Sequence, residues 1–260
     1  MSAMDPGRGA LAAALRGGRE LFSTFVKTNA YQVTEILGSC AFDFLALDAE
    51  HAPLGIESLD RCCLAARAAG SAALVRVPNT RPDTIMRVLD MGAAGIIAPH
   101  VDDAASARGI VAATRYRGHE GRRGFSNSPR AGGYGRASLR DHIDASDAET
   151  LVVAQIESRL AVENIDEIAG TPGIDCLFIG RADLAVSCGR TETDHPEIEQ
   201  AVRTVADAAR RHSVPAGIFL NGASDLDRFR ALGLKVFIMG SDQSHLIQAC
   251  TALLRQCRGA

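Results

Sequence analysis

The sequence lacks a long run of like charge, a C-x-x-C pair of cysteines, and any apolar stretch near the roughly 20 residues that cross a bilayer. With 28 basic against 31 acidic residues and a formal charge of -3, it offers no polycationic face for nucleic acid or anionic lipid. Its seven cysteines, an odd number with Cys62 and Cys63 adjacent, favour reduced thiols over disulfides, a redox pair or a zinc site. We therefore expect a soluble cytoplasmic protein with a small-molecule partner, no nucleic-acid partner and no membrane partner.

Residues 1–20 are expected to form an N-terminal helix that precedes the main domain. The apolar run at residues 10–15 is short, is followed by Arg16 and Arg19, and has no convincing cleavage site, which favours a helix over a signal peptide. A hydrophobic content of 47% is ample for one continuous core, so residues 21–260 are expected to form a single domain.

Eight short apolar runs, bounded by polar residues or glycine, predict β-strands. They are residues 21–26, 42–48, 72–77, 95–99, 151–157, 174–180, 216–220 and 236–240. The runs are continuous rather than alternating, which indicates a sheet covered on both faces. The segments between them have helical patterns, for instance residues 83–90, where Ile85, Met86 and Leu89 share one face. Regular alternation of strand and helix predicts an α/β fold, a parallel (β/α)8 TIM barrel.

Two segments extend this plan. The connection between the fourth and fifth strands, residues 101–150, holds a helical pattern at 103–115 and then a loop rich in glycine and arginine. Such a loop fits an active-site flap, a subunit contact or a disordered surface insertion. The last helix, residues 244–257, carries several apolar side chains and is expected to cover the barrel of its own chain or of a neighbour.

Polar side chains end several of the predicted strands, and in a parallel barrel all these ends meet at one rim. His51 follows the second strand, Arg76 ends the third, Gln155 and Glu157 end the fifth, and Asp183 follows the sixth. A buried strand that ends in an ionised carboxylate needs a partner for the charge. Glu157 and Asp183 are therefore predicted to bind a hard divalent cation, Mg2+, Mn2+ or Co2+.

This set of side chains suits proton abstraction next to a carbonyl. The cation would chelate a 2-oxo acid and polarise its ketone. Arg76 would place positive charge beside the developing enolate oxygen, and His51 would move the proton through a water. Each residue alone also has a structural interpretation: a surface histidine, an arginine paired with an acid, and carboxylates that cap helices. Their convergence on one rim is what favours a site.

The chain resembles the metal-dependent class II pyruvate aldolases of the HpcH/HpaI group, within the phosphoenolpyruvate/pyruvate barrel superfamily. The resemblance runs from about residue 22 to about residue 246. Its most specific motifs are residues 42–53, 75–78, 89–93, 121–124, 155–158 and 178–184. It implies a lyase that reversibly cleaves a 4-hydroxy-2-oxo acid, of the 4-hydroxy-2-oxoheptanedioate or 2-keto-3-deoxy sugar acid type, to pyruvate and an aldehyde through a metal-stabilised enolate.

The resemblance also implies roles for individual residues. They are His51 as general base, Arg76 as stabiliser of the enolate, Asp90 as the acid that raises the basicity of the histidine, Glu157 and Asp183 as metal ligands, and Gln155 and the backbone of Ala182 as contacts of the 2-oxo acid. Asp90 closes a helix that is expected to run away from the rim, so its role would require a neighbouring subunit or a water chain. A homohexamer is implied as well, a trimer of dimers with exchanged C-terminal helices.

The sequence departs from the family pattern at Arg181, where relatives commonly have proline. The added cation would favour an acidic or phosphorylated acceptor. The tryptophan that relatives often carry near the first strand is also missing, and Phe22 or Phe25 is expected to fill its space. Two other functions stay open: a CoA-thioester lyase of the citrate/malyl-CoA lyase type, and an inactive barrel that only binds. One chain does not determine which aldehyde is used.

Overall fold

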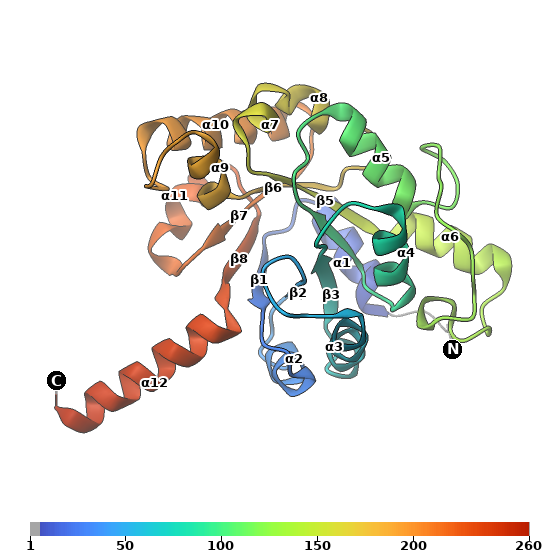
Figure 1. Ribbon diagram of the computed structural model, residues 1–260, viewed down its shortest axis with the longest axis horizontal. Coiled ribbons are helices and arrows are strands. Elements are labelled where there is room, and N and C mark those ends of the chain that lie inside the picture. Colours follow the sequence, from blue (N-terminus) through green and yellow to red (C-terminus); the bar gives the residue numbers. More distant parts are fainter. Residues whose placement is uncertain (1–5, 260) are drawn as a thin grey trace.

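The computed structural model describes residues 6–259, in which eight strands form a closed parallel barrel in the order β1 to β8 (Figure 1). The strands are β1 (Leu21–Val26), β2 (Phe44–Asp48), β3 (Ala72–Arg76), β4 (Gly95–Ala98), β5 (Leu151–Ile156), β6 (Cys176–Ile179), β7 (Ala216–Leu220) and β8 (Val236–Ser241). All eight predicted strands are confirmed, with no end displaced by more than two residues. The (β/α)8 prediction is confirmed with them.

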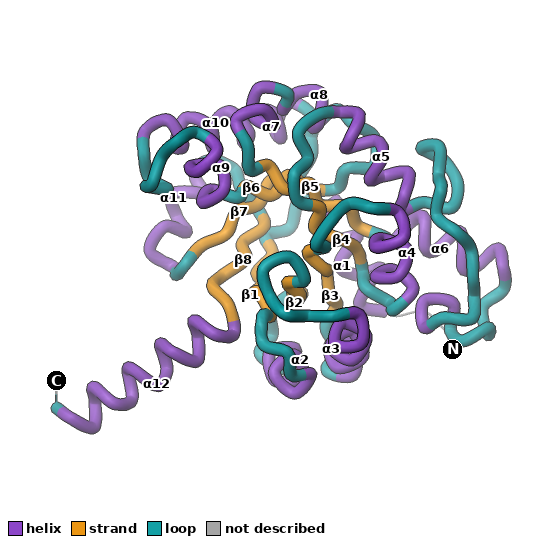
Figure 2. Tube along the Cα trace, in the orientation of Figure 1, coloured by secondary structure: helices purple, strands orange, loops and turns teal. Residues whose placement is uncertain are grey.

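Helices surround the strands on the outside of the barrel (Figure 2). They are α2 (Tyr31–Gly38), α3 (Ile56–Ala68), α4 (Pro82–Asp90), α5 (Ala104–Thr114), α7 (Arg159–Glu163), α8 (Ile165–Ala169), α9 (Arg181–Ser187), α10 (Pro196–Arg211) and α11 (Leu226–Ala231). Their apolar faces follow helical spacing; in α10, Ile198, Val202 and Val205 are buried. The side chain of Asp103 caps α5 by accepting a hydrogen bond from the Ser106 amide.

The N-terminal helix α1 (Pro6–Arg16) packs against the inside of the barrel. Leu11 and Leu15 share a buried cluster with Phe44, Leu74 and Phe178 from the strands. Residues 1–5 of the expected N-terminal helix lie outside the described residues, as does residue 260 of the expected barrel domain. Apolar side chains fill the interior at this end. The polar residues that could form a site are therefore expected at the opposite rim, where the strands have their carboxyl ends. Within the described residues, no helix is long and apolar enough to cross a membrane.

The long connection between β4 and β5 is fastened to the outside of the barrel. Besides α5, it contains a short 3-10 turn (Arg130–Gly132) and α6 (Leu139–Glu149). The buried guanidinium of Arg123 lies 2.7 Å from Asp90 at the end of α4, and that of Arg130 lies 2.8 Å from Asp60 in α3. The arginines of this loop therefore attach it to neighbouring helices.

The C-terminal helix α12 (Asp242–Arg258) leaves the barrel (Figure 1). Its first turn is held by Asp242, whose carboxylate accepts hydrogen bonds from the amides of Lys27 and Thr28. Farther along, Leu246 and Ile247 are each 66% exposed and Leu253 is 60% exposed. This uncovered apolar face fits a helix that is exchanged between subunits, and the exchange itself stays a prediction.

Candidate functional site

The carboxyl end of β2 is joined to that of β3 by a buried ion pair. The register sets Asp48 opposite Arg76, and Arg76 binds it through two hydrogen bonds, Nε to Oδ1 at 3.0 Å and Nη2 to Oδ2 at 2.7 Å. Lys27 adds a third cationic contact at 3.3 Å from Oδ2. Burial opposes ionisation, but the hydrogen bonds and charge of Arg76 outweigh it and lower the pKa of Asp48.

The same pair fixes the orientation of Arg76. Its guanidinium lies 4.5 Å from the ring centroid of Phe25, and its Nε lies 3.3 Å from Oε2 of Glu50. Among residues 6–259, no hydrogen-bond partner is found for Nη1. Arg76 is therefore a structural partner of Asp48. Its guanidinium is also fixed in orientation, with Nη1 available to donate a hydrogen bond to a ligand.

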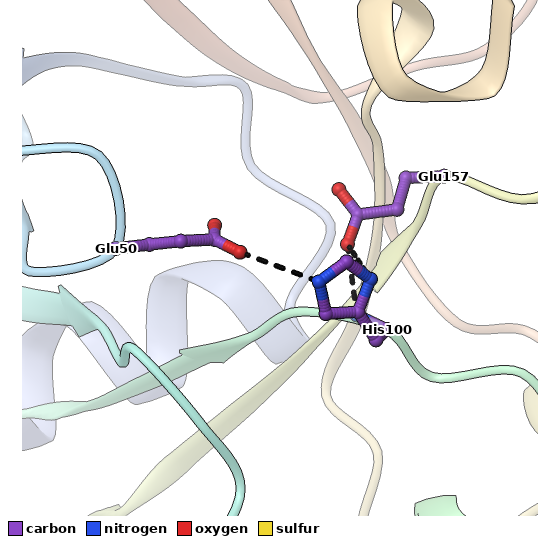
Figure 3. Close-up of side chains that lie close together, drawn as sticks. All are labelled: Glu50, His100 and Glu157. Atoms are coloured by element: carbon purple, nitrogen blue, oxygen red, sulfur yellow. Dashed lines mark hydrogen bonds and ion pairs between the residues drawn. The ribbon is translucent and has the colours of Figure 1, made fainter. Parts of the chain in front are cut away.

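Three side chains gather at the centre of the rim (Figure 3). Glu50, His100 and Glu157 each offer a ligand atom, and these atoms lie within 4.8 Å of one another. Nδ1 of His100 is 3.2 Å from Oε1 of Glu157, and its Nε2 is 3.7 Å from Oε1 of Glu50. The backbone amide of His100 also donates to Oε1 of Glu157, at 2.8 Å. Carboxylate oxygen and imidazole nitrogen are common ligands of divalent metals.

The electrostatics of this group favour the binding of a cation. Oε2 of Glu50 is buried and accepts no hydrogen bond within the described part of the chain. Burial raises the pKa of Glu50; Arg76 partly offsets this increase, and the charge on Glu157 adds to it. The amide of Gln155 donates to Oε2 of Glu157, while its own Oε1 is buried and has no hydrogen-bond partner among residues 6–259. A divalent cation would stabilise the two facing carboxylates, so these residues fit one.

The predicted ligand Asp183 lies in the first turn of α9, immediately after β6, and is exposed, as is Ala182. It is outside the group of three ligand atoms that the described residues form. The turn before it packs closely against Glu157: a Cβ on Gly180 would lie 3.0 Å from the Glu157 Cβ and 3.2 Å from its Oε2. Asp183 as a metal ligand and the backbone of Ala182 as a substrate contact remain predictions.

Arg181, at the start of α9, has its guanidinium 4.8 Å from the ring centroid of Phe229 in α11. Two residues along a helix correspond to a rotation of about 200°, so Arg181 and Asp183 project from different sides of α9. The contact with Phe229 gives Arg181 a packing role. It does not support the expectation that this cation selects an acidic acceptor.

His51 lies at the rim, and Asp90 does not reach it within one chain. The His51 side chain is 54% exposed, with Nε2 at 3.7 Å from Oε2 of Glu50, and its amide donates to Asp48. Asp90 ends α4, which leads into the amino-terminal end of β4, and it is paired with Arg123. Its predicted effect on His51 would therefore need a neighbouring subunit or a water chain, and stays a prediction.

The structure thus links His51, Arg76, Gln155 and Glu157 through a continuous set of contacts by way of Glu50 and His100. Three members of this set had been given no role from the sequence: Asp48, Glu50 and His100. Asp48 and Glu50 belong to the same strand end as His51. His100 follows β4, which is not among the strands whose polar ends were predicted to form the site. The rule that strand ends meet at one rim would have found it.

Comparison with known proteins is consistent with this geometry. A family model described as HpcH/HpaI aldolase/citrate lyase matches residues 21–249. A 5-keto-4-deoxy-D-glucarate aldolase of Shigella boydii serotype 18 is 38% identical over 210 residues, which are 80% of this chain and 80% of that protein. A crystal structure of an HpcH/HpaI aldolase/citrate lyase family protein from Burkholderia cenocepacia J2315 superposes with a TM-score of 0.92 at 32% identity, covering 96% of this chain and 99% of the other. The citrate synthase SbnG gives a TM-score of 0.86 at 28% identity, covering 96% and 97%.

Proposed function

Because this chain belongs to the HpcH/HpaI aldolase/citrate lyase family, we propose that it cleaves a 4-hydroxy-2-oxo acid reversibly to pyruvate and an aldehyde. It is a carbon–carbon lyase of a metal-dependent family. The observation that carries the proposal is the group of facing carboxylates at the rim, in which one buried oxygen of Glu50 accepts no hydrogen bond within the described residues and has only the ion pair with Arg76 beside it. The 5-keto-4-deoxy-D-glucarate aldolases at 38% identity favour a sugar-derived diacid as the substrate.

Glu157 and Asp183 would hold the metal ion, Mg2+, Mn2+ or Co2+. When bound there, such an ion would act as a Lewis acid that polarises the ketone of the 2-oxo acid and lowers the energy of the enolate. The carboxylate of Glu157 is suited to this role because it is buried and oriented by Gln155 and by the backbone of His100.

The remaining residues would bind the substrate and move one proton. Arg76 would donate from Nη1 to the oxygen on which negative charge develops. Gln155 and the amide of Ala182 would orient the carboxylate of the 2-oxo acid. His51 would take the proton of the 4-hydroxyl through a water as the C3–C4 bond breaks, and this proton would end on C3, giving pyruvate. No lysine in these motifs is placed to form a Schiff base.

The experiment removes the metal from the enzyme and measures cleavage of 5-keto-4-deoxy-D-glucarate and 4-hydroxy-2-oxoheptanedioate by the pyruvate released. We expect activity to disappear with EDTA, to return with Mn2+, and to be lost in Glu157→Gln. Undiminished cleavage by metal-free protein would refute the proposal. Borohydride with pyruvate should not label the protein. A metal-supplemented screen of pyruvate against succinic semialdehyde, glycolaldehyde and sugar-derived aldehydes would identify the acceptor.

A second candidate is a reaction on a CoA thioester or citrate-like substrate, favoured by the fold match to the citrate synthase SbnG at 28% identity. It ranks below the aldolase because the relatives at 38% identity are aldolases. Release of acetyl-CoA from citryl-CoA or malyl-CoA would support it. An inactive barrel would bind neither pyruvate nor oxalate in a metal-dependent way, which titration calorimetry would detect.

We also propose that the protein is a homohexamer, a trimer of dimers in which α12 is exchanged. The exposed apolar face of α12 supports this assembly. Light scattering coupled to size exclusion would give the mass, and a monomer at micromolar concentration would contradict it.

A further inference from the structure

We propose that His100 supplies a nitrogen ligand to the metal ion held by Glu157, and that Glu50 orients the imidazole. The inference rests on the proposed function only in requiring that a divalent cation binds at Glu157. It extends that function because the oxygen-only site expected from the sequence becomes a mixed oxygen and nitrogen site.

The backbone places His100 against Glu157 from the neighbouring strand end. His100 follows β4 with a φ of 55°, a left-handed conformation that is uncommon for residues other than glycine. This conformation brings its amide to 2.8 Å and its Nδ1 to 3.2 Å from the same oxygen, Oε1 of Glu157. Each carboxylate oxygen has two acceptor positions, so the amide hydrogen bond leaves room for a cation on Oε1.

The distances suit ligation through Nδ1. Donors bound to one ion at about 2.1 Å lie at most roughly 4 Å apart, and the Nδ1 to Oε1 distance of 3.2 Å falls inside that limit. The imidazole is 72% exposed, which leaves it free to make the small adjustment that ligation needs. The other nitrogen, Nε2, faces Oε1 of Glu50 at 3.7 Å (Figure 3).

Metal-binding histidines commonly place one nitrogen on the ion and donate the other N–H to a carboxylate. Nε2 of His100 already faces the Glu50 carboxylate, and a small movement of the exposed imidazole would bring it from 3.7 Å to hydrogen-bond distance. This arrangement also gives a function to Glu50, a side chain that is 10% exposed and has one oxygen without a hydrogen bond in the described structure. Glu50 acts through His100 and is therefore a positioning residue. Without a bound ion, the imidazole of His100 would only bridge the carboxylates of Glu50 and Glu157.

Imidazole changes the expected preference among metals. Nitrogen ligands favour Co2+ over Mg2+, which is held by oxygen ligands. Loss of His100 should therefore weaken Co2+ binding more than Mg2+ binding. If all the protein ligands were oxygen atoms, loss of His100 would weaken Co2+ and Mg2+ binding equally or not at all.

The test is pulsed EPR on the full-length protein loaded with Mn2+. We expect modulation from a directly bound 14N in the parent, its replacement by the 15N signal after selective labelling of histidine with 15N, and its loss in His100→Gln. His51→Gln, a second histidine of the same rim, is the matched control and should retain the modulation. The labelling experiment uses the parent sequence, so it remains decisive if a variant does not fold.

Calorimetry gives an independent measurement. Co2+ should bind about tenfold or more weakly to His100→Gln than to the parent, with a smaller loss for Mg2+, and Glu50→Gln should weaken Co2+ by about tenfold. Mn2+ bound without nitrogen coupling would overturn the inference and leave the metal-dependent aldolase intact. Failure of the parent to bind Mn2+ at all would overturn both.

Discussion

Replacing Asp48 with asparagine tests the buried ion pair that holds Arg76. Asparagine preserves the shape of the side chain and one acceptor oxygen but removes the negative charge. In the native protein that charge is matched by Arg76 at 2.7 Å and by Lys27 at 3.3 Å, and Asp48 is fully buried. Asp48→Asn therefore removes the anion that these two cations share at the rim.

The cost can be estimated from the contacts. Breaking a buried pair by removing one partner costs about 3–5 kcal/mol. Arg76 retains Glu50 at 3.3 Å as an alternative anion, and the asparagine oxygen still accepts one hydrogen bond, so we expect the lower end, about 3 kcal/mol. This is a large fraction of the roughly 5–15 kcal/mol that stabilises a folded domain. Because Arg76 also loses its fixed orientation, kcat/KM should fall as well.

The assay is urea unfolding at equal protein concentration, with Asp207→Asn as the matched control. Asp207 is paired with Arg210 at the same 2.7 Å but on the exposed surface, so its replacement should cost under about 1 kcal/mol. If an unpaired Arg76 causes the loss, then Asp48→Asn combined with Arg76→Met should be less destabilised than the sum of the single variants. Equal unfolding midpoints for Asp48→Asn and the parent would refute the reasoning.

Three further predictions concern the metal, pH and assembly. Gly180→Ala should weaken Mn2+ binding about tenfold in calorimetry, since its Cβ would lie 3.0 Å from the Glu157 Cβ, whereas Gly55→Ala, which meets open space, should bind normally. The pKa of Asp48 is lower when folded than the roughly 3.9 of the unfolded chain, so its stabilisation is present above about pH 4 and is lost as the pH falls through the folded pKa. The stability difference between parent and Asp48→Asn should accordingly shrink below pH 4, and a constant difference in urea titrations would contradict this. Leu253→Asp on α12 should reduce the mass measured by light scattering, and an unchanged mass would argue against exchange of α12.

The strands could be predicted because their signal is local. A strand covered on both faces is apolar at every position, as in Leu151–Ile156, and each run is interrupted by glycine or polar residues where the chain turns. Eight such runs alternating with helical patterns leave few alternatives to a barrel. The same rule places His51, Arg76, Gln155 and Glu157 at one rim from the sequence alone.

Contacts between side chains could not be predicted in the same way. The pairing of Arg76 with Asp48 depends on the β2–β3 register, and the contact of His100 with Glu157 joins residues 57 positions apart. The orientation of Arg181 toward Phe229 likewise follows from the rotation of α9 about its axis. A shift of a few ångströms would break each of these contacts without altering any local pattern.

By itself, the sequence therefore determined the barrel, the rim at which chemistry is placed and the acidic character of that rim, because burial and periodicity are properties of short segments. Only the tertiary structure decided which carboxylates face each other, that a histidine lies between Glu50 and Glu157, and that Arg76 is held by Asp48. The reason is that charge stabilisation and metal ligation depend on distances between atoms from different strands, which are set when the barrel closes.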